Sequence, residues 1–188
     1  MYLFLVPLVF GFACNVASVF TATFSHWWGE RSGSLVTVVL RDILGIPVWA
    51  IGFVLAVRAP SPILFVSTVV TNVVGWLIIT TGGIIVLLAL IAIRGRAAMP
   101  SMQDNLVQTG LYAYVRHPIH SGTFLEFLGL VFLMPLQTVA IASALGGVWI
   151  LVQTRYEEID LLQRIPAYRS YMNSVPCFLP RFRVRLGK

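Results

Sequence analysis

Hydrophobic positions are gathered along the chain into long apolar segments separated by short polar ones. Five segments have the composition of helices that cross the hydrocarbon core of a bilayer. They cover residues 2–24, 35–57, 63–93, 119–134 and 137–156. The third is long for a single crossing, which tilt accommodates, and the fourth is short. The pattern predicts an all-α fold, a polytopic transmembrane helix bundle of about five spans.

Composition strengthens this interpretation. Of the 188 residues, 58% are hydrophobic and only 11% are charged, whereas a soluble domain has about 25% charged residues. We therefore expect an integral, multi-pass membrane protein. Residues 1–93 hold three predicted spans and are expected to form the scaffold and the substrate side. Residues 94–188 hold the polar motifs, a transmembrane hairpin and a closing tail, and are expected to form the catalytic region.

The basic residues predict how the chain is oriented. With five spans, the 24–35 loop, the 94–118 loop and the C-terminal tail share one side, and that side carries eleven Lys and Arg residues. The opposite side carries Arg58 alone. The positive-inside rule then places the C-terminus in the cytoplasm and the N-terminus outside. The net charge of +6 is explained by this bias and by anionic membrane lipids, so no nucleic-acid partner is expected.

A polar cassette, residues 110–122, lies between the third and fourth segments. Pro118 disfavours helix at the residue before it and suits the first turn of a helix. The free N–H groups at such a helix start attract an anionic group. Arg116 adds a planar fork suited to a carboxylate, and His117 and His120 can donate or accept hydrogen bonds. Gly122 would let a ligand approach the backbone.

A second polar group, Arg155 with Glu157 and Glu158, ends the fifth segment. Adjacent side chains lie about 100° apart around a helix, so one glutamate is expected to point into a site and the other to pair with Arg155. Taken singly, these residues could be interfacial groups or a solvated helix end. Because the cassette and this group stand at the same end of one hairpin, we expect them to share a site.

The polar loops are too short for a separate nucleotide-binding domain. About 24 residues join spans three and four, and about 30 follow span five, whereas a βαβ unit needs a sheet and crossover helices. Any nucleotide-like cofactor must therefore be held against the helix ends.

The ordered motifs resemble a known family. The cassette has the form Gly-x-Tyr-x-x-x-Arg-His-Pro-x-x-x-Gly, and a hydrophobic hairpin and Arg-x-Glu-Glu follow it. The C-terminal tail then contains Tyr168-x-x-Tyr171, Val175-Pro176 and Leu179-Pro180. Together these motifs, over about residues 106–181, resemble the isoprenylcysteine carboxyl methyltransferase family and its phospholipid methyltransferase relatives.

The resemblance implies an enzyme that uses S-adenosyl-L-methionine in a cytosol-facing pocket and takes a lipophilic small-molecule or lipid substrate from the bilayer. It implies cofactor-binding roles for a set of cassette and helix-end residues. These are Gly110, Leu111, Tyr112, Arg116, His117, Pro118, Gly122, Glu157 and Glu158. Catalytic roles are expected for Arg116, His120 and Arg155, since arginine could orient an acceptor carboxylate and histidine could take a proton from an amine.

The chain departs from the family at two places. His120 stands where the family usually has Tyr, which changes the chemistry facing the substrate, and Ile165-Pro166 replaces Phe-Gly. Glu126, two turns into the fourth segment, is costly in a membrane and is expected to line a substrate tunnel or to be hydrogen-bonded within the bundle. No metal site is expected, because no acidic or thiol ligand completes a recognisable spacing with the histidines.

Two other functions stay open at this point. Sterol and steroid reductases have a similar Arg-His-Pro region and bind NADPH, and a non-catalytic membrane accessory protein is the third reading. The acceptor, whether a carboxylate, a thiol or an amine, and the oligomeric state cannot be read from the sequence.

Overall fold

The computed structural model describes residues 2–93 and 105–180, and each regular element in these ranges is helical. In chain order the elements are α1 (Leu5–Ser18), α2 (Thr21–Trp28), α3 (Glu30–Val38), the π-helical segment η1 (Val39–Gly45), α4 (Ile46–Arg58), α5 (Val69–Ile93), the 3-10 segment η3 (Gly110–Ala113), α6 (Pro118–Leu133), α7 (Gln137–Arg164) and α8 (Tyr168–Ser174). The predicted all-α fold is confirmed for these residues.

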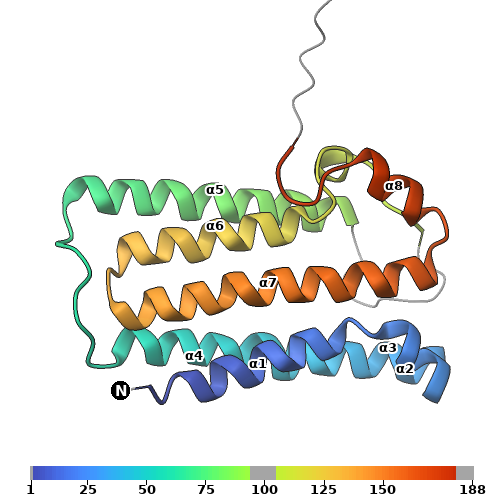
Figure 1. The fold of residues 1–188 in the computed structure, drawn as a ribbon, viewed down its shortest axis with the longest axis horizontal. Helices are drawn as coiled ribbons and strands as arrows, with labels where there is room; N and C mark the ends of the chain where they lie inside the picture. The colour runs from blue at the N-terminus through green and yellow to red at the C-terminus, as the bar shows by residue number, and fades with distance from the viewer. Residues whose placement is uncertain (1, 94–104, 181–188) are drawn as a thin grey trace, which may run out of the picture.

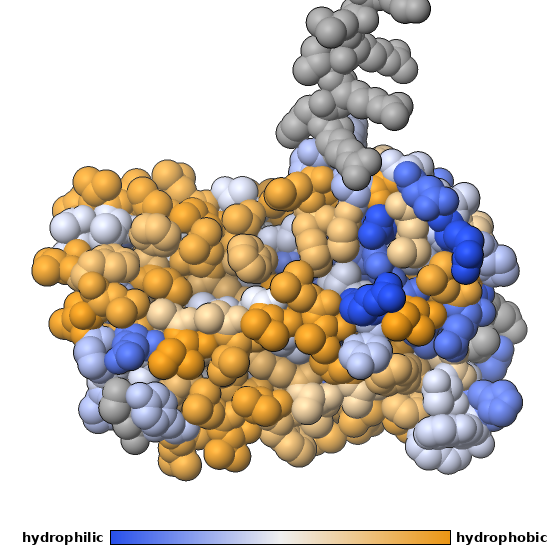
Figure 2. All heavy atoms as spheres, in the orientation of Figure 1, coloured by the Kyte–Doolittle hydropathy of each residue, from blue (hydrophilic) through white to orange (hydrophobic). Residues whose placement is uncertain are grey.

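The five longest helices lie side by side along the long axis of the molecule (Figure 1). Helix α5 packs on α6, α6 packs on α7, and α7 packs on the pair formed by α1 and α4. The short helices α2, α3 and α8 gather at one end, and the N-terminus and the α6–α7 turn lie at the other. Figure 2 shows apolar side chains over the long body and hydrophilic ones near α8, as expected for a membrane-embedded bundle.

The helix lengths confirm an integral membrane protein in outline. Three helical stretches in the described residues, Glu30–Arg58, Val69–Ile93 and Gln137–Arg164, are long and apolar enough to cross a bilayer. Helices α1 and α2 would make a fourth span, but a 66° bend separates them. Helix α6 has 16 residues, about 24 Å of rise, which is shorter than the roughly 30 Å hydrocarbon core. The count of five spans and the orientation therefore stay predictions.

Two helices have a first or last residue that differs from the one that the hydropathy pattern predicted. Helix α5 begins at Val69 rather than at residue 63. Helix α7 runs to Arg164, beyond residue 156, although its last two turns carry acidic residues. The last turns remain packed because Glu158 and Asp160 are buried against basic partners. Hydropathy averaged along the sequence does not detect such partners.

Breaks in the N-terminal helices have local causes. Gly29 separates α2 from α3 with a positive φ of 83°, a conformation that glycine adopts without a Cβ penalty. Pro47 has no N–H to donate to the carbonyl of Ile43, and the turn before it is the π-helical segment η1. This segment carries Arg41 to the end of the bundle that holds the polar residues.

Glycines set the close packing of α5 on α6. A Cβ added at Gly82 would lie 2.6 Å from the carbonyl oxygen of Gly122, and one added at Gly129 would lie 2.9 Å from that of Gly75. Side chains at these positions would push the helices apart. Small residues that allow backbones to approach are the usual means of helix association in membranes. This packing fixes the start of α6, where the polar cassette ends.

Aromatic residues from four helices form the core of the bundle. Phe12 of α1 stacks on Trp149 of α7 with ring centroids 4.8 Å apart, and Phe53 of α4 stacks on Phe127 of α6 at 5.0 Å. Such pairs each contribute about 0.5–1.5 kcal/mol beyond burial. The core holds α7 at the centre of the bundle, so the polar last turns of α7 are delivered to a fixed place.

Candidate functional site

The polar cassette is bound to the end of the chain by paired backbone hydrogen bonds. The N–H groups of Arg116 and His117 donate to the carbonyls of Pro176 and Cys177, at 2.9 and 3.1 Å. The hydroxyl of Ser121 donates to the carbonyl of Phe178 at 3.0 Å. We call residues 172–178 the closing segment. Because Pro118 keeps the preceding residues out of the helix, their N–H groups are available for this contact.

Arg116 joins the closing segment to α7. Its Nε and Nη2 each lie 2.8 Å from Oε1 of Glu158, and its Nη1 donates to the carbonyls of Met172 and Val175 at 2.9 and 2.6 Å. Only 12% of the Arg116 side chain and 8% of the Glu158 side chain are exposed. Glu158 therefore pairs with Arg116, and the expected pair between Glu158 and Arg155 is wrong.

His117 lies between the two glutamates. Its Nε2 is 3.2 Å from Oε1 of Glu158 and its Nδ1 is 3.6 Å from Oε2 of Glu157, so both neighbouring acids of α7 meet one ring. Burial lowers the pKa of His117, but the two carboxylates outweigh it and raise the pKa to about 9. The ring is therefore a cation at neutral pH. Adjacent side chains of α7 point in directions about 100° apart, and the ring lies between them, so it contacts both acids.

His120, one turn into α6, extends the same row of groups. Its ring stacks on that of His117 with centroids 5.5 Å apart. Its Nδ1 lies 2.8 Å from the hydroxyl of Thr154 and 3.9 Å from Oε2 of Glu157. These contacts fix the imidazole against α7, with one ring nitrogen engaged by a hydroxyl.

A cavity of about 290 Å³ opens beside this row. Its wall comes from η1, α5, η3, α6, α7 and α8 and from residues 105–107. The polar and aromatic side chains in the wall are Arg41, Asn105, Tyr112, Arg116, His117, His120, Gln153, Glu157, Arg164, Tyr168 and Tyr171. The volume is at the lower end of small-molecule sites, and the lining mixes cations, one carboxylate and phenols.

The phenols in the wall remain protonated. Burial, followed by nearby carboxylates, raises the pKa of Tyr112 and of Tyr168 above the usual range. The hydroxyl of Tyr168 lies 3.4 Å from Nε2 of His117, and that of Tyr171 donates to the carbonyl of Tyr112 at 2.6 Å. The second bond ties α8 to η3 in the wall of the cavity.

The structure brings together five of the residues expected from the sequence. Arg116, His117, His120, Tyr112 and Glu157 line the cavity, and Glu158 lies behind them against Arg116. Gly110 starts η3 with a positive φ of 61°, Leu111 follows it, and Pro118 is buried at the first turn of α6.

Three expected site residues lie elsewhere. Gly122 approaches the backbone of α5 rather than the cavity. Glu126 packs against Gly82 and Gly83 of α5, and Arg155 is exposed; neither lines the cavity.

Sequence reasoning missed several cavity residues. Gln153 and Leu161 stand one turn before and one turn after Glu157 on α7, so their helical spacing could have identified them. Arg164 follows the same face and is held by Asp160 at 2.6 Å. Arg41 forms an ion pair with its neighbour Asp42 at 2.8 Å. No local signal shows that Arg41 also reaches the cavity.

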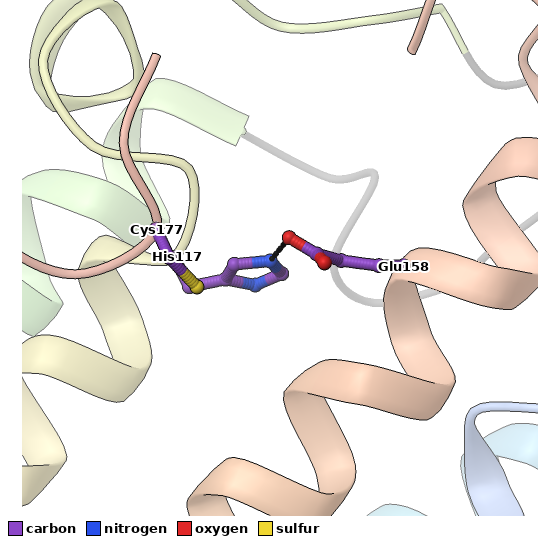
Figure 3. Close-up of side chains that lie close together, drawn as sticks. All are labelled: His117, Glu158 and Cys177. Atoms are coloured by element: carbon purple, nitrogen blue, oxygen red, sulfur yellow. Dashed lines mark hydrogen bonds and ion pairs between the residues drawn. The ribbon is translucent and has the colours of Figure 1, made fainter. Parts of the chain in front are cut away.

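Two overlapping groups have donor atoms close enough to hold a metal ion. One joins His117 and Glu158 to Cys177, and the other joins His117 to His120 and Glu157, with ligand atoms within 4.8 Å of one another. Figure 3 shows the His117 ring hydrogen-bonded to the carboxylate of Glu158, with the Cys177 sulfur beside the ring. The same carboxylate also binds the permanent cation Arg116, and this charge disfavours a metal at the first group.

Comparison with known proteins identifies the family. A model of the family described as phospholipid methyltransferase matches residues 70–168, which is 99 of 188 residues and more than half of the chain. No curated protein and no solved structure matches the chain. The matched region includes the cassette, the α6–α7 hairpin and the acidic end of α7, which supply most of the cavity wall. The chain belongs to the phospholipid methyltransferase family.

Proposed function

We propose that this protein transfers the methyl group of S-adenosyl-L-methionine to a lipophilic acceptor at the cytoplasmic face of the membrane. Family membership indicates a membrane methyltransferase. The observation that carries the finer proposal is the cavity beside His117 and Glu157, most of whose lining residues lie in the matched region and which α8 also lines. The excess of basic residues on one side of the predicted topology supports the cytoplasmic placement.

The residues of the cavity fit this cofactor. Glu157 is the carboxylate in the lining, and it can accept hydrogen bonds from ribose hydroxyls or the methionyl amine. Arg41 and Arg164 enter the same wall from η1 and α7, which suits a carboxylate at the other end of the ligand. The phenols of Tyr112, Tyr168 and Tyr171 offer flat faces and protonated hydroxyls.

The cofactor supplies an electrophilic methyl group, so the protein has to align the nucleophile and exclude water. The closing segment excludes water because Arg116 and the backbone of His117 hold it over the start of α6. Arg116 and Glu158 thus act as positioning residues, while His117 and Glu157 face the ligand. The His120 ring stacks on the His117 ring and also contacts Trp149 of the aromatic core, so His120 lies on the side of the cavity nearest that core.

A second hollow supports a lipophilic acceptor. An open apolar groove runs between α1 and α7, lined by Val9, Phe12, Ala13, Val16, Ala17, Phe20, Trp149 and Tyr156. It lies on the apolar body of the molecule, where hydrocarbon chains would surround it. The ring of Trp149 also contacts His120, which lines the cavity. A chain lying in the groove would therefore have its head group near the cofactor.

Cofactor binding tests this function directly. Purified protein in detergent is titrated calorimetrically with S-adenosylhomocysteine and, separately, with NADPH. We expect S-adenosylhomocysteine to bind and Glu157→Gln to weaken it at least tenfold. Glu30→Gln, a change at an exposed acid of α3, is the matched control and should bind like the wild type. Binding of NADPH alone, or of neither compound, would refute the proposal.

A further inference from the structure

Asn15 of α1 is a buried polar residue, only 2% exposed, that contacts both η1 and α4. Its amide nitrogen donates to the carbonyl of Arg41 at 3.2 Å, and its amide oxygen accepts from the indole Nε1 of Trp49 at 3.1 Å. Both partners require this orientation of the amide, because a carbonyl only accepts and an indole N–H only donates. A Cβ added at Gly45 would overlap the Asn15 amide, so the close approach of α1 to η1 requires glycine there.

The π-helical turn of η1 aligns two buried faces. Thr37 in α3 and Gly45 at the end of η1 are both buried. Their separation in a regular α-helix would turn Gly45 about 80° away from the face of Thr37, whereas the extra residue of a π-turn brings the two within about 20°. The carbonyl of Arg41 accepts from the N–H of Ile46, five residues later, and Asn15 supplies a second donor to it. Asn15 therefore holds the π-turn at Arg41.

The side chain of Arg41 lines the cavity and has the geometry for binding a carboxylate. Its Nε and Nη2 donate to Oδ1 and Oδ2 of Asp42 at 2.8 and 2.9 Å, which is the bidentate arrangement of an arginine with a carboxylate. The Asp42 side chain is 41% exposed, and an exposed ion pair of this kind is weak. The carboxylate of a ligand can therefore replace that of Asp42 at little cost.

The other two arginines of the cavity wall are held by buried acids. Arg164 lies 2.6 Å from Asp160, of which 3% is exposed, and Arg116 lies 2.8 Å from Glu158, of which 8% is exposed. Turning either arginine toward a ligand would leave a buried carboxylate without compensation, which is costly. Arg41 is therefore the arginine of this wall best suited to a ligand carboxylate.

We propose that Arg41 binds the carboxylate of the methionyl group of the cofactor, and that Asn15 is the positioning residue that holds Arg41 there through its backbone. Trp49 orients the Asn15 amide by donating to its oxygen. The inference rests on the proposed function. All three residues precede residue 70, where the family match begins. The N-terminal helices thus supply a cofactor contact from outside the matched region.

Two ligands that differ by one carboxylate test the inference. They are S-adenosylhomocysteine and S-adenosyl-3-thiopropylamine, which lacks that carboxylate. Calorimetry on purified protein in detergent gives the affinity for each. We expect the wild type to prefer S-adenosylhomocysteine, and Arg41→Gln and Asn15→Leu each to weaken its binding about tenfold while changing the affinity for the amine little. A loss of folded protein would lower the binding of both ligands equally, so the ratio of the two affinities reports on the carboxylate contact.

Two further variants separate positioning from packing. Trp49→Phe keeps an aromatic ring but removes the indole N–H, and it should lower the preference for S-adenosylhomocysteine about threefold. Thr138→Val is the matched control, because it removes a buried side-chain hydrogen bond of 2.6 Å to the carbonyl of Ala56, near the other end of α4. It should keep the wild-type preference. If Asn15→Leu does not fold, the comparison of Trp49→Phe with Thr138→Val decides.

Several results would overturn the inference. A wild type that binds both ligands equally, or an unchanged preference in Arg41→Gln, would show that Arg41 does not bind the carboxylate. An unchanged preference in Asn15→Leu and Trp49→Phe, or equal weakening of both ligands in these variants, would show that Asn15 does not position Arg41. Failure of the wild type to bind S-adenosylhomocysteine would instead refute the proposed function.

Discussion

Replacing Arg116 with Ala should open the closing segment. The side chain makes two contacts with Glu158 and two with carbonyls of residues 172 and 175. Removing one partner of a buried ion pair costs about 3–5 kcal/mol, because the other charge is left without compensation. His117 still contacts Glu158 and offsets part of that cost. We therefore expect about 3 kcal/mol, which corresponds to a decrease of more than a hundredfold in the equilibrium constant between the closed and the open segment.

The thiol of Cys177 reports on this opening. Cys177 lies in the closing segment and is partly buried, and burial, followed by the charge of Glu158, raises the pKa of its thiol. Few thiolates are therefore present in the closed state. In a Cys14→Ser background, Arg116→Ala should label with maleimide much faster than the parent. Arg116→Lys keeps the charge but loses the planar fork and should fall between the two.

The binding of S-adenosylhomocysteine gives the second measurement on the same proteins. If the closing segment forms a wall of the cofactor site, affinity should fall in the order wild type, Arg116→Lys, Arg116→Ala. Labelling of Cys177 at the parent rate in Arg116→Ala, together with unchanged affinity, would refute the reasoning. Faster labelling with unchanged affinity would show that the segment is held as described but does not close the site.

Three further predictions concern single features of the structure. The pKa of His117 is raised from 6.5 to about 9, so its stabilising effect is complete below pH 6.5 and is lost as pH rises through 9, up to about 3 kcal/mol; thermal unfolding should show this loss, and His117→Gln should abolish it. Gly82→Ala should lower stability by about 1–3 kcal/mol because its Cβ would meet α6, whereas Gly83→Ala, with its nearest atom at 3.6 Å, should be neutral in the same assay. Tyr171→Phe should cost about 1 kcal/mol in thermal unfolding through its bond to the carbonyl of Tyr112, while the exposed Tyr114→Phe should cost nothing.

The helices could be predicted from the sequence because the features that indicate them are local. Apolar runs and Pro118 at a helix start predicted the two halves of the α6–α7 hairpin. The short length of α6 was predicted, since the fourth apolar segment also has 16 residues. The 66° bend after α1 could not be predicted, because packing among helices sets it. The division at residue 93 stays a prediction, although Arg41 shows that the first part contributes to the cavity.

The residues of the candidate site could be predicted from the sequence only where they belong to a motif. The cassette and the paired acids converge because they stand at the same end of one hairpin, which the order of spans already implied. The partner of Glu158 was misassigned, since helical spacing favoured Arg155 while the structure uses Arg116 from 42 residues away. Helical spacing describes contacts within one helix, and it gives no weight to a loop folded against that helix. The buried Nε1 of Trp149 and Oε1 of Gln153 have no hydrogen-bond partner among the described residues, and nothing in the sequence indicates this.

The three acids near the end of α7 explain how separate segments reach one place. A carboxylate in a membrane helix is costly unless it is partnered, and the two buried acids have partners from different parts of the chain. Glu158 binds Arg116 of the cassette, and Asp160 accepts from the N–H of Ala22 at the start of α2 and binds Arg164. The cost of leaving an acid alone thus selects the arrangement in which the cassette and α2 meet α7.

This arrangement separates structural acids from the one that faces the ligand. Glu158 and Asp160 are buried, with 8% and 3% of their side chains exposed, whereas 38% of the Glu157 side chain is exposed beside the cavity. We therefore expect Glu158→Gln and Asp160→Asn to lower the unfolding temperature. Glu157→Gln, which removes the 3.6 Å contact to His117, should lower that temperature less than Glu158→Gln does and should weaken the binding of S-adenosylhomocysteine. Thermal unfolding and calorimetry on the three variants decide the matter, and a Glu157→Gln protein that loses stability while keeping its affinity would show that Glu157 is structural too.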